Sequence, residues 1–147
     1  MRAPLILVVL VIVACRNASG DTSIGVPRSG AYSLRLLGLG SKEALDENGD
    51  KLPSCGDEGG SVFDSLSQLT LVFNAAKGTA IVNGEEWTVL KRSGTFASKR
   101  ITDCTSLTLR FRSRGSSASG LLLYIARCKE RPACASVAEY KGTFTAK

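Results

Sequence analysis

Short runs in which apolar and polar residues alternate make up most of the chain beyond residue 30. The clearest covers residues 107–112, which read LTLRFR, and its period of two predicts a strand with one buried and one solvated face. Leu107, Leu109 and Phe111 are therefore expected to point into a core. Further strands are predicted over residues 32–37, 69–73, 79–82, 87–90, 121–125 and 137–144.

Turn residues separate these runs. Asn83-Gly84 accommodates the two positive φ angles of a two-residue turn, so a hairpin is expected over residues 79–90. Glycines with serine neighbours predict further breaks, at Gly94, Gly115, Gly120 and Gly142. A short helix fits residues 60–66, but no window sustains a helical period. About seven to eight short strands at this spacing predict a single all-β domain over residues 31–147, folded as an antiparallel barrel or sandwich.

The first residues have the features of an export signal. Arg2 precedes an uninterrupted apolar run, residues 5–14. A membrane-spanning helix needs about 20 apolar residues, whereas the hydrophobic region of a signal peptide has about 7–15. Residues 1–14 are therefore interpreted as a signal peptide. Cleavage after Gly20, in Ala18-Ser19-Gly20, is the alternative, and it would release a soluble secreted protein.

Cys15 ends this apolar run, in the sequence Ile12-Val13-Ala14-Cys15. The segment resembles the lipobox of bacterial lipoproteins, in which the cysteine is lipidated and becomes the mature N-terminus. The resemblance implies acyl chains on Cys15 that anchor the protein to a membrane. Residue 16 is Arg rather than Asp, which in the enteric sorting pattern implies the outer membrane. Residues 15–30 are polar and rich in Gly and Ser, and we expect a flexible tether about 20 Å long.

The other four cysteines are Cys55, Cys104, Cys128 and Cys134, an even number that fits disulfides in an oxidising compartment. Four cysteines allow three pairings, and the sequence does not choose among them. The small loop between them favours Cys128 with Cys134, which leaves Cys55 with Cys104. No two cysteines have the close spacing of a zinc site and the chain has no histidine, so no metal is expected there.

Charge is unevenly distributed along the chain. Residues 16–84 carry a net charge of −2 (6 basic, 8 acidic), and residues 85–147 a net charge of +7 (12 basic, 5 acidic). The period of two places Arg110 and Arg112 on one solvated face, with Arg114 next in phase. Lys91 and Arg92 add to this basic face.

The positive electrostatic field of such a face attracts anionic lipid headgroups, anionic polysaccharide or an acidic protein surface. The alternative is an ordinary solvated strand face. Nucleic acid is not expected as a partner, because the basic strand lacks interleaved exposed aromatic residues that would stack on bases.

The absence of histidine limits the chemistry. No Ser-His-Asp or Cys-His nucleophile and no histidine proton shuttle can be formed. Glu85 with Glu86, or Asp57 with Glu58, are the remaining carboxylate pairs, but neighbours on a strand point to opposite faces. We therefore expect no enzymatic activity and no cofactor.

Two further features suggest ligands. Residues 46–57 place Asp46, Asn48, Asp50 and Asp57 at the spacing of a calcium loop, although Lys51 occupies the position where the sharp turn needs Gly. An exposed Asn48-Gly49 turn is the preferred interpretation. Trp87, the only tryptophan, is expected in the core; a lipocalin-like carrier would instead place it with Phe73 and Phe111 around an apolar cavity.

Two resemblances concern the domain itself. Its length, export signal and strand pattern resemble those of small cysteine-stabilised β-barrel lipoproteins, including lysozyme-inhibitor types. Residues 106–124, SLTLRFRSRGSSASGLLLY, are similar to the last strands of CUB domains and imply a secreted CUB-like binding domain as an alternative. The preferred hypothesis is a membrane-anchored envelope lipoprotein that binds an anionic or protein partner without catalysis.

Overall fold

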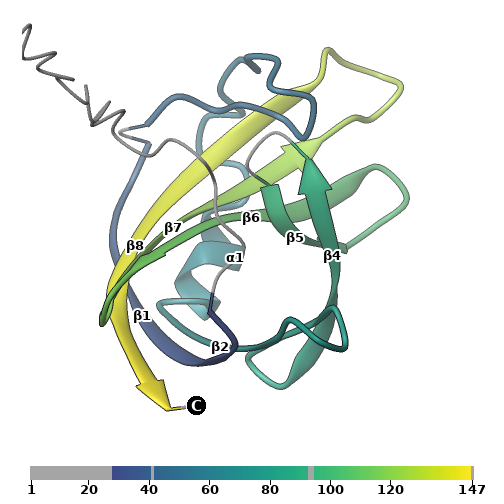
Figure 1. Cartoon of the computed structure of the whole chain (residues 1–147). Coiled ribbons are helices and arrows are strands. Elements are labelled where there is room, and N and C mark those ends of the chain that lie inside the picture. Colours follow the sequence, from purple (N-terminus) through teal and green to yellow (C-terminus); the bar gives the residue numbers. More distant parts are fainter. Residues whose placement is uncertain (1–27, 41, 93–94, 147) are drawn as a thin grey trace, which may run out of the picture.

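Eight antiparallel strands form a closed barrel in a computed structural model that describes residues 28–40, 42–92 and 95–146 (Figure 1). They follow one another around the barrel in chain order, and the first strand pairs with the last. Their bounds are β1 Gly30–Leu39, β2 Gln68–Asn74, β3 Thr79–Val82, β4 Glu85–Arg92, β5 Thr95–Arg100, β6 Thr105–Arg114, β7 Ser117–Ala126 and β8 Cys134–Ala146. The all-β prediction is confirmed, and closure selects the barrel over the sandwich.

The seven predicted strands all occur, and a short helix, α1 (Gly60–Ser65), lies in the predicted interval. The sequence pattern missed β5. Phe96 and Ala97 are consecutive and both buried, which breaks the alternation that identifies a strand. The predicted breaks at Gly120 and Gly142 were wrong, because both glycines lie inside strands, in β7 and β8.

The β3–β4 hairpin forms as expected. Asn83 and Gly84 have φ angles of 48° and 83°, and Val82 pairs with Glu85 across the turn. The Asn83 side chain also accepts a hydrogen bond from the backbone N–H of Thr70 (2.7 Å) and donates one to the carbonyl of Gln68 (3.1 Å). These bonds tie the turn to the start of β2.

Aromatic side chains fill the barrel interior. The rings of Tyr32 and Phe111 lie 4.9 Å apart, those of Phe73 and Phe96 4.9 Å apart, and Phe96 joins the two pairs at 5.7 Å from Phe111. Leu107, Leu109 and Phe111 are buried in the same core, as predicted. An eight-stranded barrel is just wide enough for side chains to fill it, and Phe63 of α1 adds to the core.

The two ends of the barrel differ. One end, here called the terminal end, carries the start of β1, the end of β8 and the β2–β3 and β6–β7 turns. The opposite end, here called the loop end, carries the long β1–α1 connection, α1 itself, and the β5–β6 and β7–β8 loops. Part of the β1–α1 connection also covers the outer wall: its Ala44 and Leu52 pack on Leu123 and Ile125 of β7.

Candidate functional site

Three arginines project from the outer wall of the barrel along β6. Arg112 and Arg114 are exposed and Arg110 is half-buried, and they alternate with the inward-facing Leu109 and Phe111. Burial lowers the pKa of Arg110 below its ordinary value, and the neighbouring positive charge of Arg112 lowers it further, while Asp46 acts in the opposite sense. The structure thus places these residues on the face that their period predicted.

Closure of the barrel brings two more cations beside them. The pairing partner of Arg112 is Ser119, that of Ser119 is Lys141, and that of Lys141 is Arg35 of β1. Arg112, Lys141 and Arg35 are all exposed and stand in one row that crosses four strands. Arg35, Arg110, Arg112, Arg114 and Lys141 are called the cationic band below.

Sequence reasoning missed Arg35 and Lys141 as members of this face. Their strands were predicted, and their phase placed them outside, but only the strand order and the register make them neighbours of Arg112. Lys91 and Arg92 were expected on the same face, but their side chains lie outside the described residues. Cys15 lies outside them as well.

Arg35 and Lys141 face each other directly across the β1–β8 pair. Like charges in this arrangement repel and destabilise a sheet. Among the ion pairs of the described residues, none involves Arg35, Arg112, Arg114 or Lys141. Glu139, one outward position before Lys141 on β8, borders the band on the side of the loop end. The row of Arg35, Lys141 and Arg112 therefore concentrates positive charge on the outer wall.

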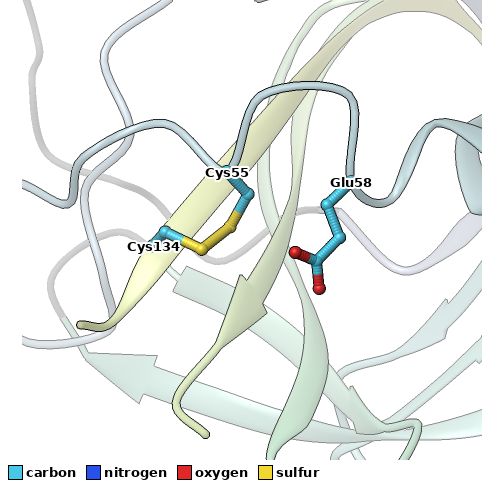
Figure 2. Close-up of side chains that lie close together, drawn as sticks. All are labelled: Cys55, Glu58 and Cys134. Carbon is cyan, nitrogen blue, oxygen red and sulfur yellow. A yellow bond between two sulfur atoms is a disulfide. The ribbon is translucent and has the colours of Figure 1, made fainter. Parts of the chain in front are cut away.

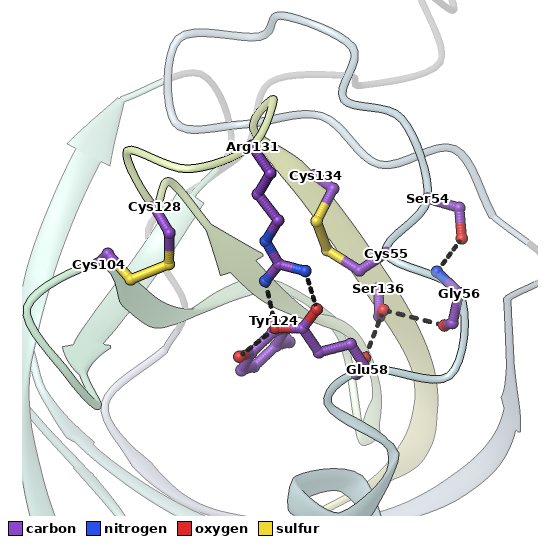
Figure 3. Close-up of polar contacts among 10 residues, drawn as sticks. All are labelled: Ser54, Cys55, Gly56, Glu58, Cys104, Tyr124, Cys128, Arg131, Cys134 and Ser136. Carbon is purple, nitrogen blue, oxygen red and sulfur yellow. Dashed lines mark hydrogen bonds and ion pairs between the residues drawn. A yellow bond between two sulfur atoms is a disulfide. The ribbon is translucent and has the colours of Figure 1, made fainter.

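Two disulfides cross-link the loop end, with a pairing that differs from the predicted one. Cys55 is bonded to Cys134 and Cys104 to Cys128 (Figure 3). Both predicted pairs, Cys128–Cys134 and Cys55–Cys104, were therefore wrong. The even count itself was right.

The neighbours of each cysteine explain this pairing. Arg127 donates its backbone N–H to the carbonyl of Cys104 (2.7 Å), which brings the end of β7 alongside the β5–β6 loop. Ala135 exchanges backbone hydrogen bonds with the β1–α1 connection, accepting one from Cys55 (3.1 Å) and donating one to Pro53 (2.8 Å). The two ends of the β7–β8 loop thus contact different segments, so proximity in sequence misled the prediction.

An ion pair lies between the two disulfides. The Arg131 guanidinium contacts both carboxylate oxygens of Glu58, and the Tyr124 hydroxyl donates a hydrogen bond to Glu58 Oε1 (3.1 Å; Figure 3). Arg131 lowers the pKa of Glu58, whereas burial and the Glu58 carboxylate raise the pKa of Tyr124. The Ser136 hydroxyl donates to the Glu58 carbonyl (2.7 Å). The β7–β8 loop is therefore held at both ends and in the middle.

Cys55, Glu58 and Cys134 lie close enough together to resemble a metal site, with ligand atoms within 4.8 Å of one another (Figure 2). The two sulfur atoms are bonded to each other, so neither is a thiolate that could bind a metal. The Glu58 carboxylate already pairs with Arg131. The cluster is thus accounted for as a disulfide beside an ion pair.

The calcium-like segment forms the expected turn. Asp46 Oδ1 accepts hydrogen bonds from the backbone N–H groups of Asn48 (2.9 Å) and Asp50 (2.8 Å), and Gly49 has a φ of 86°. Arg127 donates to Asp46 Oδ2 (3.2 Å) and to Glu47 (3.0 Å). Burial alone would raise the pKa of Asp46, but these donors outweigh it and hold the pKa below its ordinary value. A guanidinium therefore already neutralises carboxylates of this loop.

The three residues proposed to line a carrier cavity, Phe73, Trp87 and Phe111, are all buried in the barrel core, where Trp87 was expected. Phe73 and Phe111 are packed against Phe96 inside the core. Trp87, although 4% exposed, borders a cleft of about 340 Å³ at the loop end, between α1 and strands β3 to β6. Glu85, one of the candidate acids, also borders this cleft and forms an ion pair with Lys99.

Within the described residues, no helix has the length and apolar character needed to cross a membrane. Comparisons with models of known protein families, with curated proteins and with solved structures find no match for this chain.

Proposed function

We propose that this protein is a non-catalytic binding module of the cell envelope, which acyl chains on Cys15 hold at the outer membrane and whose cationic band binds an anionic partner. The observation that carries the proposal is the row formed by Arg112, Lys141 and Arg35, in which two cations face each other directly. A row of exposed like charges is unfavourable for the barrel alone, so a multivalent anion is its natural complement.

The position of the band supports a role close to a surface. Arg112 and Arg114 are near the terminal end of β6, and the described chain begins at that end, with Arg28. About twelve residues between Cys15 and Arg28 would span roughly 20 Å as a flexible coil. The anchor would thus hold the band within reach of headgroups, anionic glycans or acidic proteins of the envelope.

Binding of anions is tested with a variant that reverses the row: Arg35→Glu, Arg112→Glu and Lys141→Glu together. The mature chain should carry Cys15→Ser, so that no acyl chain contributes to binding. Vesicles of phosphatidylglycerol, an acidic polysaccharide and pull-down from envelope extract separate the three kinds of partner. Each cation near an anionic surface contributes about 1 kcal/mol, so loss of three lowers affinity at least ~100-fold.

A matched control reverses three exposed lysines elsewhere: Lys51, Lys77 and Lys129. This control changes the net charge by the same amount and leaves the row intact. We expect it to retain most of the binding, and we expect added salt to weaken the unaltered protein steeply. Equal binding by the two variants would show that the band is only a solvated wall.

The anchor is tested separately, by mass spectrometry of the mature N-terminus. An acylated Cys15 is the expected result. An unmodified chain that starts at Asp21 would refute the anchor and make the protein a soluble secreted one.

A further inference from the structure

The cleft beside α1 combines an apolar floor with a charged pair. The buried Val82, Trp87 and Leu107 of the barrel form the floor, and the half-buried Val62 and Leu66 of the helical segment with the exposed Ile101 supply accessible apolar surface. Its volume of about 340 Å³ lies at the lower end of the ~300–1,000 Å³ that small-molecule sites occupy.

The charged pair occupies positions that normally face the core. Lys99 is the pairing partner of the buried Leu107, and Glu85 that of the buried Val82. Their side chains nevertheless remain accessible, 38% for Lys99 and 61% for Glu85. At the mouth of a barrel this places an ammonium group next to an apolar surface and within reach of solvent.

The ammonium group of Lys99 has three N–H donors, so it can hold the Glu85 carboxylate and still bind a second acceptor. Arg100 also borders the cleft, and the three charged residues give its lining a net charge of +1. An anionic group is therefore favoured over a cationic one. The half-buried Leu66 and the exposed Ile101 offer an apolar body a place to pack above Trp87.

We propose that this cleft binds a small amphiphile with one carboxylate and a short apolar body, such as a medium-chain fatty acid. The carboxylate contacts Lys99, and the apolar body lies between the helical segment and Trp87. This site is at the loop end, separate from the cationic band on the outer wall. Its test is therefore independent of the test of the function proposed above.

Trp87 is the only tryptophan, so its fluorescence reports on the cleft directly. The mature chain carrying Cys15→Ser is titrated with octanoate, octylamine and octanol, below the concentrations at which the first two form micelles and octanol separates from water. We expect a saturable change with octanoate and weaker binding of the amine and the alcohol. No saturable change with octanoate, or equal binding of all three, would overturn the proposal.

Two variants locate the ligand. Lys99→Gln with Glu85→Gln removes both charges and leaves a polar side chain at each position, and should weaken octanoate binding about tenfold because a charge-assisted hydrogen bond is lost. Ile101→Glu places a carboxylate at the exposed rim, where Ile101 is 40% accessible, and should abolish binding without disturbing the core. Lys77→Gln, on the β2–β3 hairpin, is the control and should bind normally. If both cleft variants bind octanoate like the control, the ligand lies elsewhere and the proposal is wrong.

Discussion

Replacement of Gly142 by alanine should open the seam at which the barrel closes. Gly142 lies in β8 beside β1, and a Cβ atom built on it would lie 1.7 Å from the backbone carbonyl oxygen of Ser33 and 2.7 Å from its carbonyl carbon. Contacts below 3.0 Å are essentially never formed by Cβ atoms, and a backbone cannot rotate away as a side chain can. The two strands must therefore separate by more than 1 Å at this point.

The cost follows from the hydrogen bonds of that ladder. A separation above 1 Å takes N–H···O distances near 2.9 Å well beyond bonding range. Two lost backbone bonds at about 1 kcal/mol each, with overpacking of about 1–3 kcal/mol, give a destabilisation of at least about 3 kcal/mol. The usual effect of Gly→Ala in a strand has the opposite sign, a gain of about 0.5–1 kcal/mol.

Gly38→Ala is the matched control. Gly38 belongs to the same strand pair, and a Cβ atom there meets nothing within 4 Å. In urea unfolding followed by Trp87 fluorescence, the midpoint of Gly142→Ala should lie roughly 1–3 M below that of the unaltered protein. The midpoint of Gly38→Ala should be unchanged or slightly higher. A Gly142→Ala variant as stable as the unaltered protein would contradict the close approach of β8 to Ser33.

Two further predictions concern the loop end. Peptide mapping without reduction should recover the Cys55–Cys134 and Cys104–Cys128 disulfides, and recovery of a Cys128–Cys134 peptide would contradict the fold of this end. Chain entropy predicts that loss of Cys104–Cys128, with a separation of 24 residues, costs ~3.5 kcal/mol, and that loss of Cys55–Cys134, with a separation of 79, costs ~4.5 kcal/mol. Because the pKa of Asp46 is lowered in the folded state, its contribution to stability is present above the unfolded value near 3.9 and is lost as the pH falls below it. Asp46→Asn should therefore cost on the order of 1 kcal/mol at pH 7 and flatten the acid limb of stability measured by urea unfolding. An unchanged acid limb would contradict the role of the Asp50 and Asn48 N–H donors and of Arg127 in holding this carboxylate.

The parts of the fold that the sequence predicted depend on local chemistry. The β3–β4 hairpin follows from the positive φ angles that Asn83-Gly84 tolerates, and the inward face of β6 follows from a clean period of two. β5 was missed because the bulky Phe96 and the small Ala97 both enter the core, so its residues do not alternate.

The parts that were missed or mistaken depend on which strands become neighbours. Gly120 was expected in a turn but lies between Phe111 and Tyr140 on the adjacent strands, where a Cβ atom would come within 3.3 Å of Leu109. The disulfides follow the neighbours of each loop rather than distance along the chain. The cationic band likewise needed the register of the β1–β8 pair. Local patterns contain none of this information.

One seam connects stability to the proposed function. The pair that Gly142 allows to close, β1 with β8, is also the pair that sets Arg35 opposite Lys141. Repulsion between these cations opposes closure, and an anion bound across them would remove that opposition. A ligand that binds only the closed barrel must stabilise it by RT ln(1 + [L]/Kd), about 2.7 kcal/mol at a hundredfold excess over Kd. A polyanion that occupies the band should therefore raise the urea midpoint of the unaltered protein, and the row-reversed variant should lose this stabilisation. A polyanion that binds but leaves the midpoint unchanged would have to contact some other part of the surface.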